Sequence, residues 1–221
     1  MEVTEAIRNR KSVRAFLNKP VTDDTITDIL EYARWAPSGV NSQPWHVAVL
    51  TGEAKHQVGK ALGKLRADGE KPLPDYQYYP TKIEEPYISR KRACGQALYS
   101  ALGIERKDIE ARKTQWMKNY DCFGAPVTLL FFIDTILGKG SWVDAGMFIQ
   151  NVMLAARGLE LETCPLAALA EYPNVVRNIL NIPDSKKLIC GMALGYADYD
   201  DPSYQYRTER EPVGNFAQWY S

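Results

Sequence analysis

The sequence is short of cysteine and histidine and has no long apolar segment. Its four cysteines, Cys94, Cys122, Cys164 and Cys190, form no CxxC pair, which argues against a zinc knuckle or a thioredoxin-type redox centre. No apolar run approaches the ~20 residues of a membrane helix, and the start has no apolar stretch of signal-peptide type. We therefore expect a cytoplasmic protein with reduced, mostly buried thiols, no metal site and no membrane partner.

Net charge is also absent, because 27 Lys and Arg residues balance 27 Asp and Glu residues. A neutral chain has no global attraction for nucleic acid or anionic lipid, so we expect no nucleic-acid partner. The balance hides one local excess, since residues 8–14 (RNRKSVR) hold four basic side chains and no acid. The 221 residues, 45% hydrophobic and 24% charged, are typical of one globular domain, which we expect to span 1–221.

Hydrophobic periodicity predicts helices that alternate with a few strands, which is an α+β class. The segment 142–158 is apolar nearly all round its helix, so we expect it at the centre of the protein or in a subunit interface. The helix patterns cover residues 4–11, 23–35, 53–66, 91–120, 142–158 and 173–181, and the strand patterns cover 46–51, 127–133 and 188–196.

Two stretches lack the pattern of a core element. Residues 67–90 are rich in proline and tyrosine, which suits either a functional lid or an ordered surface loop. We interpret about 67–120 as a lid-like insertion. The polar and aromatic C-terminal arm, about 198–221, is expected to wrap over a surface.

The first candidate site is the basic cluster, defined as Arg10, Lys11, Ser12 and Arg14. Each guanidinium offers a fixed fork that matches phosphate oxygens, and the ammonium and hydroxyl groups add further donors. A solvated basic surface has the same composition, so the cluster alone leaves both interpretations open.

The second candidate site is the turn 36–46, APSGVNSQPWH, between a predicted helix and a predicted strand. Its Pro, Gly, Asn and Ser residues favour tight turns with exposed backbone donors. Asn41 and Gln43 can each donate and accept, which suits a heterocycle with mixed edges. An ordinary turn that packs Trp45 is equally consistent. The two histidines, His46 and His56, are expected to be structural or exposed, and no acid–base dyad is present.

Taken together, these segments resemble the FMN-dependent nitroreductase family. The resemblance extends from about residue 2 to 216 and includes several spaced motifs. They are R-x-S-x-R-x-F from Arg10 to Phe16, A-P-S-x-x-N-x-Q-P-W from Ala36 to Trp45, Gln150-Asn151, Cys164-Pro165-Leu166, the strand from Gly191 to Gly195, and Arg210-Glu211-Pro212.

The resemblance implies a central antiparallel or mixed sheet flanked by helices, in an intertwined homodimer with FMN at the interface. Arg14 would stabilise the negative charge of reduced flavin, and the backbone N–H of Ala167 would face flavin N5. By position, one subunit would bind the phosphate and pyrimidine edge of FMN through Arg10, Lys11, Ser12 and Arg14, and Arg207 and Arg210 would reach the phosphate from the arm. The partner subunit would contribute Pro37, Ser38, Gly39 and Asn41. The other face of the flavin would be lined by Pro165, Leu166, Ala167 and Ala168.

The implied activity is electron transfer from NAD(P)H through FMN to nitroaromatics or quinones, by a ping-pong mechanism in one open site. No residue of the chain needs to be catalytic, because the flavin carries the chemistry. Two alternatives stay open. The segment RKTQW at 112–116 is similar to a lid segment of flavin-dependent dehalogenases, which would make halogenated phenols the substrates. The second alternative is that the protein is a non-catalytic FMN-binding redox sensor. A central basic residue that contacts flavin or substrate could be Lys64, Arg66, Arg90 or Arg112.

Overall fold

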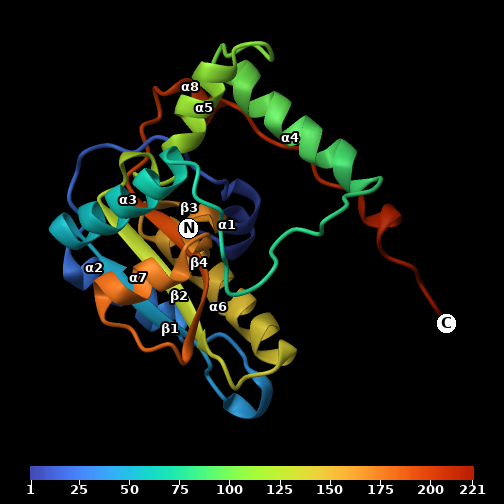
Figure 1. Ribbon diagram of the computed structural model, residues 1–221. Coiled ribbons are helices and arrows are strands. Elements are labelled where there is room, and N and C mark those ends of the chain that lie inside the picture. Colours follow the sequence, from blue (N-terminus) through green and yellow to red (C-terminus); the bar gives the residue numbers. More distant parts are fainter.

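An antiparallel sheet of four strands forms the centre of the computed structural model, which describes residues 1–221. The chain adds helices on both sides of this sheet (Figure 1). In spatial order the strands are β1 (His46–Leu50), β2 (Val127–Asp134), β4 (Lys186–Gly195) and β3 (Glu162–Leu166).

Two helix pairs cover the two faces of the sheet. Helices α3 (Gly52–Ala67) and α7 (Pro173–Leu180) share one apolar core with Leu130 and Phe132 of β2. Helices α2 (Asp23–Ala33) and α6 (Lys139–Gly158) share the other core with the alternate residues Leu129, Phe131 and Ile133. Because both faces are covered, β2 is apolar along nearly its whole length, although its pairing is antiparallel.

Most predicted elements are confirmed to within three residues at each end. Helix α2 begins at the predicted Asp23, where the Thr22 hydroxyl accepts from the Thr25 backbone N–H at 3.2 Å. Helix α7 has Pro173 in its first turn and ends at Asn181, which has a left-handed backbone. The remaining helices are α1 (Val3–Asn9), α4 (Tyr87–Ala101), α5 (Ile109–Met117) and the short α8 (Pro202–Gln205).

The prediction of one continuous helix over 91–120 is wrong. This segment is split into α4 and α5 by a turn in which Gly103 has a φ of +65°, a conformation that favours glycine. Strand β3 was not predicted, because Pro165 lies inside it and cannot donate to a ladder. The structure places β3 at the sheet edge, where a proline is tolerated.

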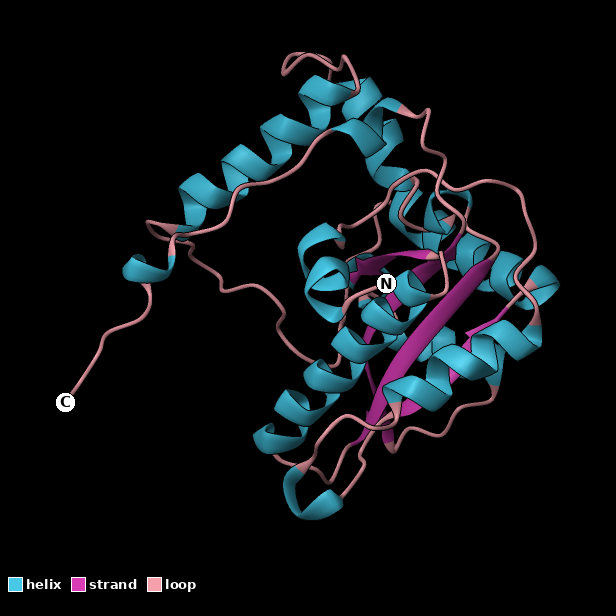
Figure 2. Ribbon diagram, turned by 180° about the vertical axis from the view of Figure 1, so that it is seen from behind, coloured by secondary structure: helices cyan, strands magenta, loops and turns pink.

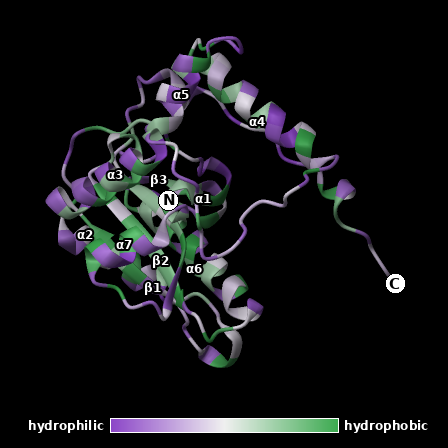
Figure 3. Cartoon of the chain, viewed as in Figure 1, coloured by the Kyte–Doolittle hydropathy of each residue, from purple (hydrophilic) through white to green (hydrophobic).

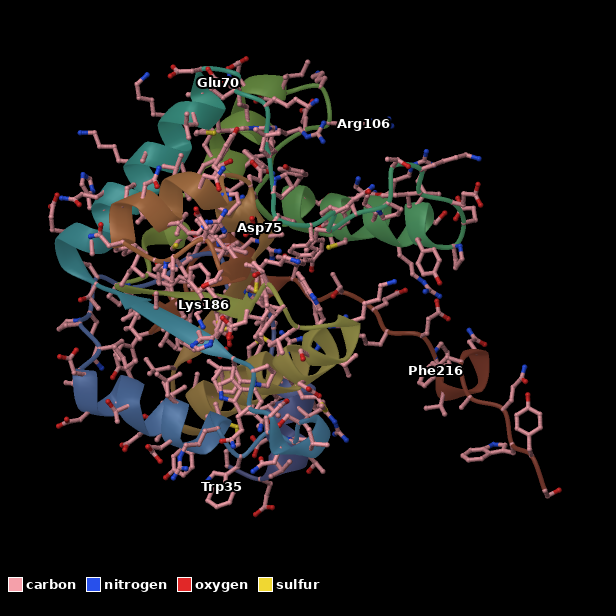
Figure 4. All side chains as sticks on the ribbon, turned by 60° about the horizontal axis from the view of Figure 1, so that its bottom comes forward. Trp35, Glu70, Asp75, Arg106, Lys186 and Phe216 are labelled. Atoms are coloured by element: carbon pink, nitrogen blue, oxygen red, sulfur yellow. The ribbon has the colours of Figure 1, made fainter.

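The tyrosine-rich stretch 67–90 divides into an anchored and a projecting part. Asp75 accepts two hydrogen bonds from Arg177 at 2.7 and 3.0 Å, and the Tyr76 hydroxyl donates to the Ile189 carbonyl at 2.8 Å. Figure 4 shows Asp75 over the body of the protein and Phe216 far out on the arm. Beyond Tyr76 the chain leads to α4, which projects from the body (Figure 1). That residues 67–120 act as a lid stays a prediction.

The C-terminal arm runs beside the projecting α4, as both views show (Figures 1 and 2). Three cysteines are buried and Cys94 on α4 is exposed, and all four are free thiols. No helix has the length and apolar character that crossing a membrane requires.

Candidate functional site

The basic cluster and the C-terminal arm together line one pocket. Residues 10–14 follow α1 in extended conformation and pair with β3 through the Ser12 bridge to Thr163. Residues 206–210 follow α8 and lie across from them. The pocket contains every residue that the sequence predicted to bind the phosphate and the pyrimidine edge of FMN from the cluster and the arm, namely Arg10, Lys11, Ser12, Arg14, Arg207 and Arg210.

The pocket has a strong excess of positive charge. None of its nine lining residues is acidic, and none of its five cations forms an ion pair within the chain. Burial lowers the pKa of Arg10, and the nearby Arg210 and Arg207 lower it further. Burial likewise lowers the pKa of Lys11, with Arg207 and Arg157 adding to the effect. An anion in this pocket would relieve that repulsion.

Two tyrosines of the C-terminal arm hold the cations of the cluster in place. Arg14 donates to the Ser12 carbonyl at 3.2 Å and to the Tyr206 hydroxyl. Lys11 donates to the Tyr204 carbonyl, and its ammonium group lies 3.5 Å from the centre of the Tyr204 ring. These contacts leave further guanidinium N–H groups of Arg14 available to a ligand.

The segment Pro165–Ala168 follows Thr163 and Cys164, the strand residues beside the basic cluster, and it is not part of the pocket lining. It comprises the end of β3 and the start of the 3₁₀ turn η3 (Ala167–Ala170). The adjacent Cys164 is buried beneath the cluster, and burial raises the pKa of its thiol to about 11 although Arg14 opposes the shift. At Gly191 of β4 a Cβ atom would lie 2.3 Å from Leu169, so η3 packs directly on the sheet backbone only because this residue is glycine.

The turn that contains Pro37, Ser38, Gly39 and Asn41 lies elsewhere. It forms the 3₁₀ turn η1 (Gly39–Asn41), with positive φ at Val40, Asn41 and Gln43 and with the Val40 side chain fully exposed. The Ser38 hydroxyl accepts from the Gln43 backbone N–H at 3.0 Å.

Asp144 of α6 fixes this turn to the body. Its two carboxylate oxygens each lie 3.4 Å from the Gly39 backbone nitrogen, and its side chain is buried. The sequence analysis missed Asp144. The available signal was a lone acid within an otherwise apolar helical segment.

Helix α6 separates the two predicted halves of the site. Asp144 lies beside the turn, whereas Arg157, near the other end of α6, acts on Lys11 of the basic cluster. Thirteen residues of α-helix span about 20 Å. Figure 1 shows the turn near one end of α6 and α1 near the other. One chain therefore brings together the cluster and the arm, but not the turn.

The other polar candidates lie outside the pocket. Among the central basic residues, Arg66 stacks on Trp116, Arg112 lies over Tyr99, Lys64 pairs with Asp68, and Arg90 pairs with Glu211 at 2.8 Å. His46 lies 3.3 Å from Asp134 on the surface, and His56 is exposed. The structure adds three pocket residues that the sequence analysis missed, Cys94, Tyr206 and Thr208. They belong to a projecting helix and an irregular arm, which have no motif pattern.

Comparison with known proteins gives consistent matches. A family model described as Nitroreductase family matches residues 7–196. The chain is 37% identical to 4-nitrobenzoate reductase of Pseudomonas putida over 214 residues, covering 96% of this chain and 93% of that protein. It is 37% identical to nitrobenzene nitroreductase of Ectopseudomonas oleovorans over 215 residues, covering 97% and 95%. The crystal structure of the FMN and NADPH-dependent nitroreductase NfnB from Sphigopyxis sp. strain HMH superposes with a TM-score of 0.97 at 37% identity, with full coverage of both chains.

Proposed function

The chain belongs to the nitroreductase family, and from this premise we propose that it is an FMN-dependent NAD(P)H nitroreductase. Its substrates are small electron-poor aromatics, nitroaromatics first. The observation that carries the proposal is the pocket of five unpaired cations without an acid, built from the residues that the FMN motif names. Relatives of similar length are named for the reduction of nitrobenzene and 4-nitrobenzoate, which supports this substrate class.

The residues of the pocket fit the phosphate of FMN. Arg10 and Arg14 offer forked donors, Lys11 adds a point charge, and Arg207 and Arg210 approach from the arm. When bound, FMN supplies the two-electron chemistry between NAD(P)H and the aromatic acceptor. Pro165–Ala168 follow the residue of β3 that pairs with Ser12 and would line the flavin. Arg14 would stabilise negative charge on the reduced ring, and the backbone N–H of Ala167 would orient its reactive edge.

The site requires a second copy of the chain, and we propose a homodimer. The turn with Ser38, Gly39 and Asn41 lies about 20 Å along α6 from the basic cluster, too far to border the same flavin within one chain. Exposed apolar side chains support this proposal on three elements near the proposed interface: Ile7 of α1, Val40 of the turn and Val143 of α6.

The alternatives have less support. Gln115 of the segment RKTQW is buried and Trp116 packs against Tyr120, so this segment is part of a packed helix. A dehalogenase lid would need it free to close over a substrate. A pure redox sensor does not fit the names of the relatives, which are reductases. The cytoplasmic location and the absence of nucleic-acid and membrane partners stay predictions.

Anaerobic reduction tests the proposed function. The purified protein should carry a yellow chromophore that NADPH or NADH bleaches and that nitrobenzoate or a quinone restores. The bleached and restored spectra should cycle with steady consumption of NAD(P)H. A colourless chain that gains no flavin absorbance on addition of FMN would contradict the proposal. A flavin that is reduced but never reoxidised by an aromatic acceptor would favour the sensor.

A further inference from the structure

The arm residues that complete the anion pocket are bracketed by two side-chain contacts. Tyr206 accepts a hydrogen bond from Arg14, and Glu211 forms an ion pair with Arg90 at 2.8 Å. No other hydrogen bond or ion pair joins residues 206–221 to the rest of the chain. Arg207 and Arg210 lie between these two points. We call residues 206–211 the clamp segment.

We propose that Tyr206 and Glu211 are positioning residues that hold Arg207 and Arg210 over the anion pocket, so that the clamp segment gives the protein its preference for a phosphorylated flavin. The inference rests on the proposed function, because it takes the anion to be the FMN phosphate. Tyr206 anchors the segment to the basic cluster, and Glu211 anchors it to the projecting helix α4.

Several features show that the clamp segment depends on these anchors. Residues 206–210 contain no helix or strand, and they form no backbone hydrogen bond to the body. Within the segment, Arg210 donates only to Thr208 and Glu209, which are its own neighbours. Arg207 and Arg210 also repel Arg10, whose pKa they lower. Without the anchors, that repulsion would favour an open arm whenever the pocket holds no anion.

Tyr206 also acts on the cluster side of the pocket. Its hydroxyl accepts from the same guanidinium group of Arg14 that donates to the Ser12 carbonyl. This pair of acceptors fixes the orientation of the guanidinium plane. One hydroxyl therefore connects a cation of the cluster to the segment that carries two more.

The chain offers a matched control earlier in the C-terminal arm. Tyr199 is exposed, lies outside the pocket, and its hydroxyl forms no hydrogen bond. Tyr206→Phe removes a hydroxyl that acts as an anchor, and Tyr199→Phe removes one that does not. Glu211→Gln tests the second anchor without touching Arg14.

The test compares FMN with riboflavin, which lacks the phosphate, by titrating flavin-free protein and following fluorescence. We expect Tyr206→Phe to weaken FMN binding about tenfold, the value of one hydrogen bond to a charged group, and Glu211→Gln to weaken it less. Riboflavin affinity should change by less than about twofold in both variants, and Tyr199→Phe should match the wild type for both ligands. In a chain that already carries Arg207→Ala and Arg210→Ala, Tyr206→Phe should weaken FMN binding less than it does in the wild type, because only its contact with Arg14 remains to be lost.

Limited proteolysis gives a second readout that does not depend on flavin. Trypsin should cut after Arg207 and Arg210 faster in Tyr206→Phe than in Tyr199→Phe. Equal loss of FMN and riboflavin affinity, or no loss of FMN affinity, would overturn the inference while the proposed function stands. A wild-type protein that binds neither ligand would overturn the proposed function and the inference with it.

Discussion

The basic cluster and the turn at 37–41 are two short motif segments with different surroundings in one chain. The cluster pairs with β3 and is completed by the C-terminal arm, so its three cations and two from the arm surround one pocket. The turn is fixed to α6 by the hydrogen bond from the Gly39 backbone N–H to Asp144, and it presents Val40 to solvent. The cluster finds its partners within the chain and forms a pocket, whereas the exposed turn would complete the pocket of the other subunit in the proposed homodimer.

This difference leads to a clear expectation about where each segment acts. Changes in the cluster should act on the site of their own subunit. In the proposed homodimer, changes in the turn should act on the site of the other subunit, because Asp144 beside the turn and Arg157 on the cluster side of α6 are about 20 Å apart along the helix.

Arg10→Ala should have the largest effect and weaken FMN binding about a hundredfold, because it removes a partly buried forked donor from the pocket. Its effect on riboflavin should be smaller. The measurement is a titration of flavin-free protein with both ligands. Arg8→Ala is the control, since Arg8 belongs to the same basic run but is exposed and outside the pocket. If both variants bound FMN equally, the pocket would not be the phosphate site.

The basic cluster also shows how far the sequence alone could lead. Its charge excess and the family motif identified Arg10, Arg14, Arg207 and Arg210, although they are separated by nearly the whole chain. Motif spacing could not identify Tyr206 or Cys94, because their place in the pocket depends on how the arm and α4 lie. These elements project from the body and have no repeating apolar face to predict from.

The same contrast holds for the fold. Helix α2 was predictable because it buries apolar side chains with a helical period, and β2 and α6 were predictable because their apolar residues form nearly continuous runs. Strand β3 was not, because Pro165 signals a loop unless the strand is known to lie at an edge. The arm carries hydrophilic and hydrophobic residues in no regular order (Figure 3), so its course was set by individual contacts such as that of Tyr206.

Subunit complementation would sharpen the comparison directly. Co-expression of an Arg10→Ala chain with a Ser38→Ala/Asn41→Ala chain should restore FMN binding to about one quarter of the sites, since half of randomly formed dimers are mixed and each has one intact site. Each variant alone should bind FMN weakly. The flavin content of the purified, differently tagged mixture measures the restored fraction.

The matched control pairs two lesions on the same side, Arg10→Ala with Arg14→Ala. Every site in that mixture lacks one cluster arginine, so binding should not recover. Recovery in the control, or none in the first mixture, would show that the turn does not complete the site of the other subunit.

The smallest expected effect concerns pH and the anchor at Glu211. Hydrogen bonds from Asn215 and Arg90 lower the pKa of Glu211, so its contribution is complete above the ordinary glutamate value of about 4.3 and is lost only as the pH falls through the lower folded value. FMN binding should weaken from pH 7 to 5 because a phosphate monoester takes up a proton near pH 6. The ratio of wild-type to Glu211→Gln affinity should therefore stay constant over this range. A ratio that approaches one at pH 5 would mean that Glu211 itself titrates there and that its ion pair with Arg90 is too weak to hold the clamp segment.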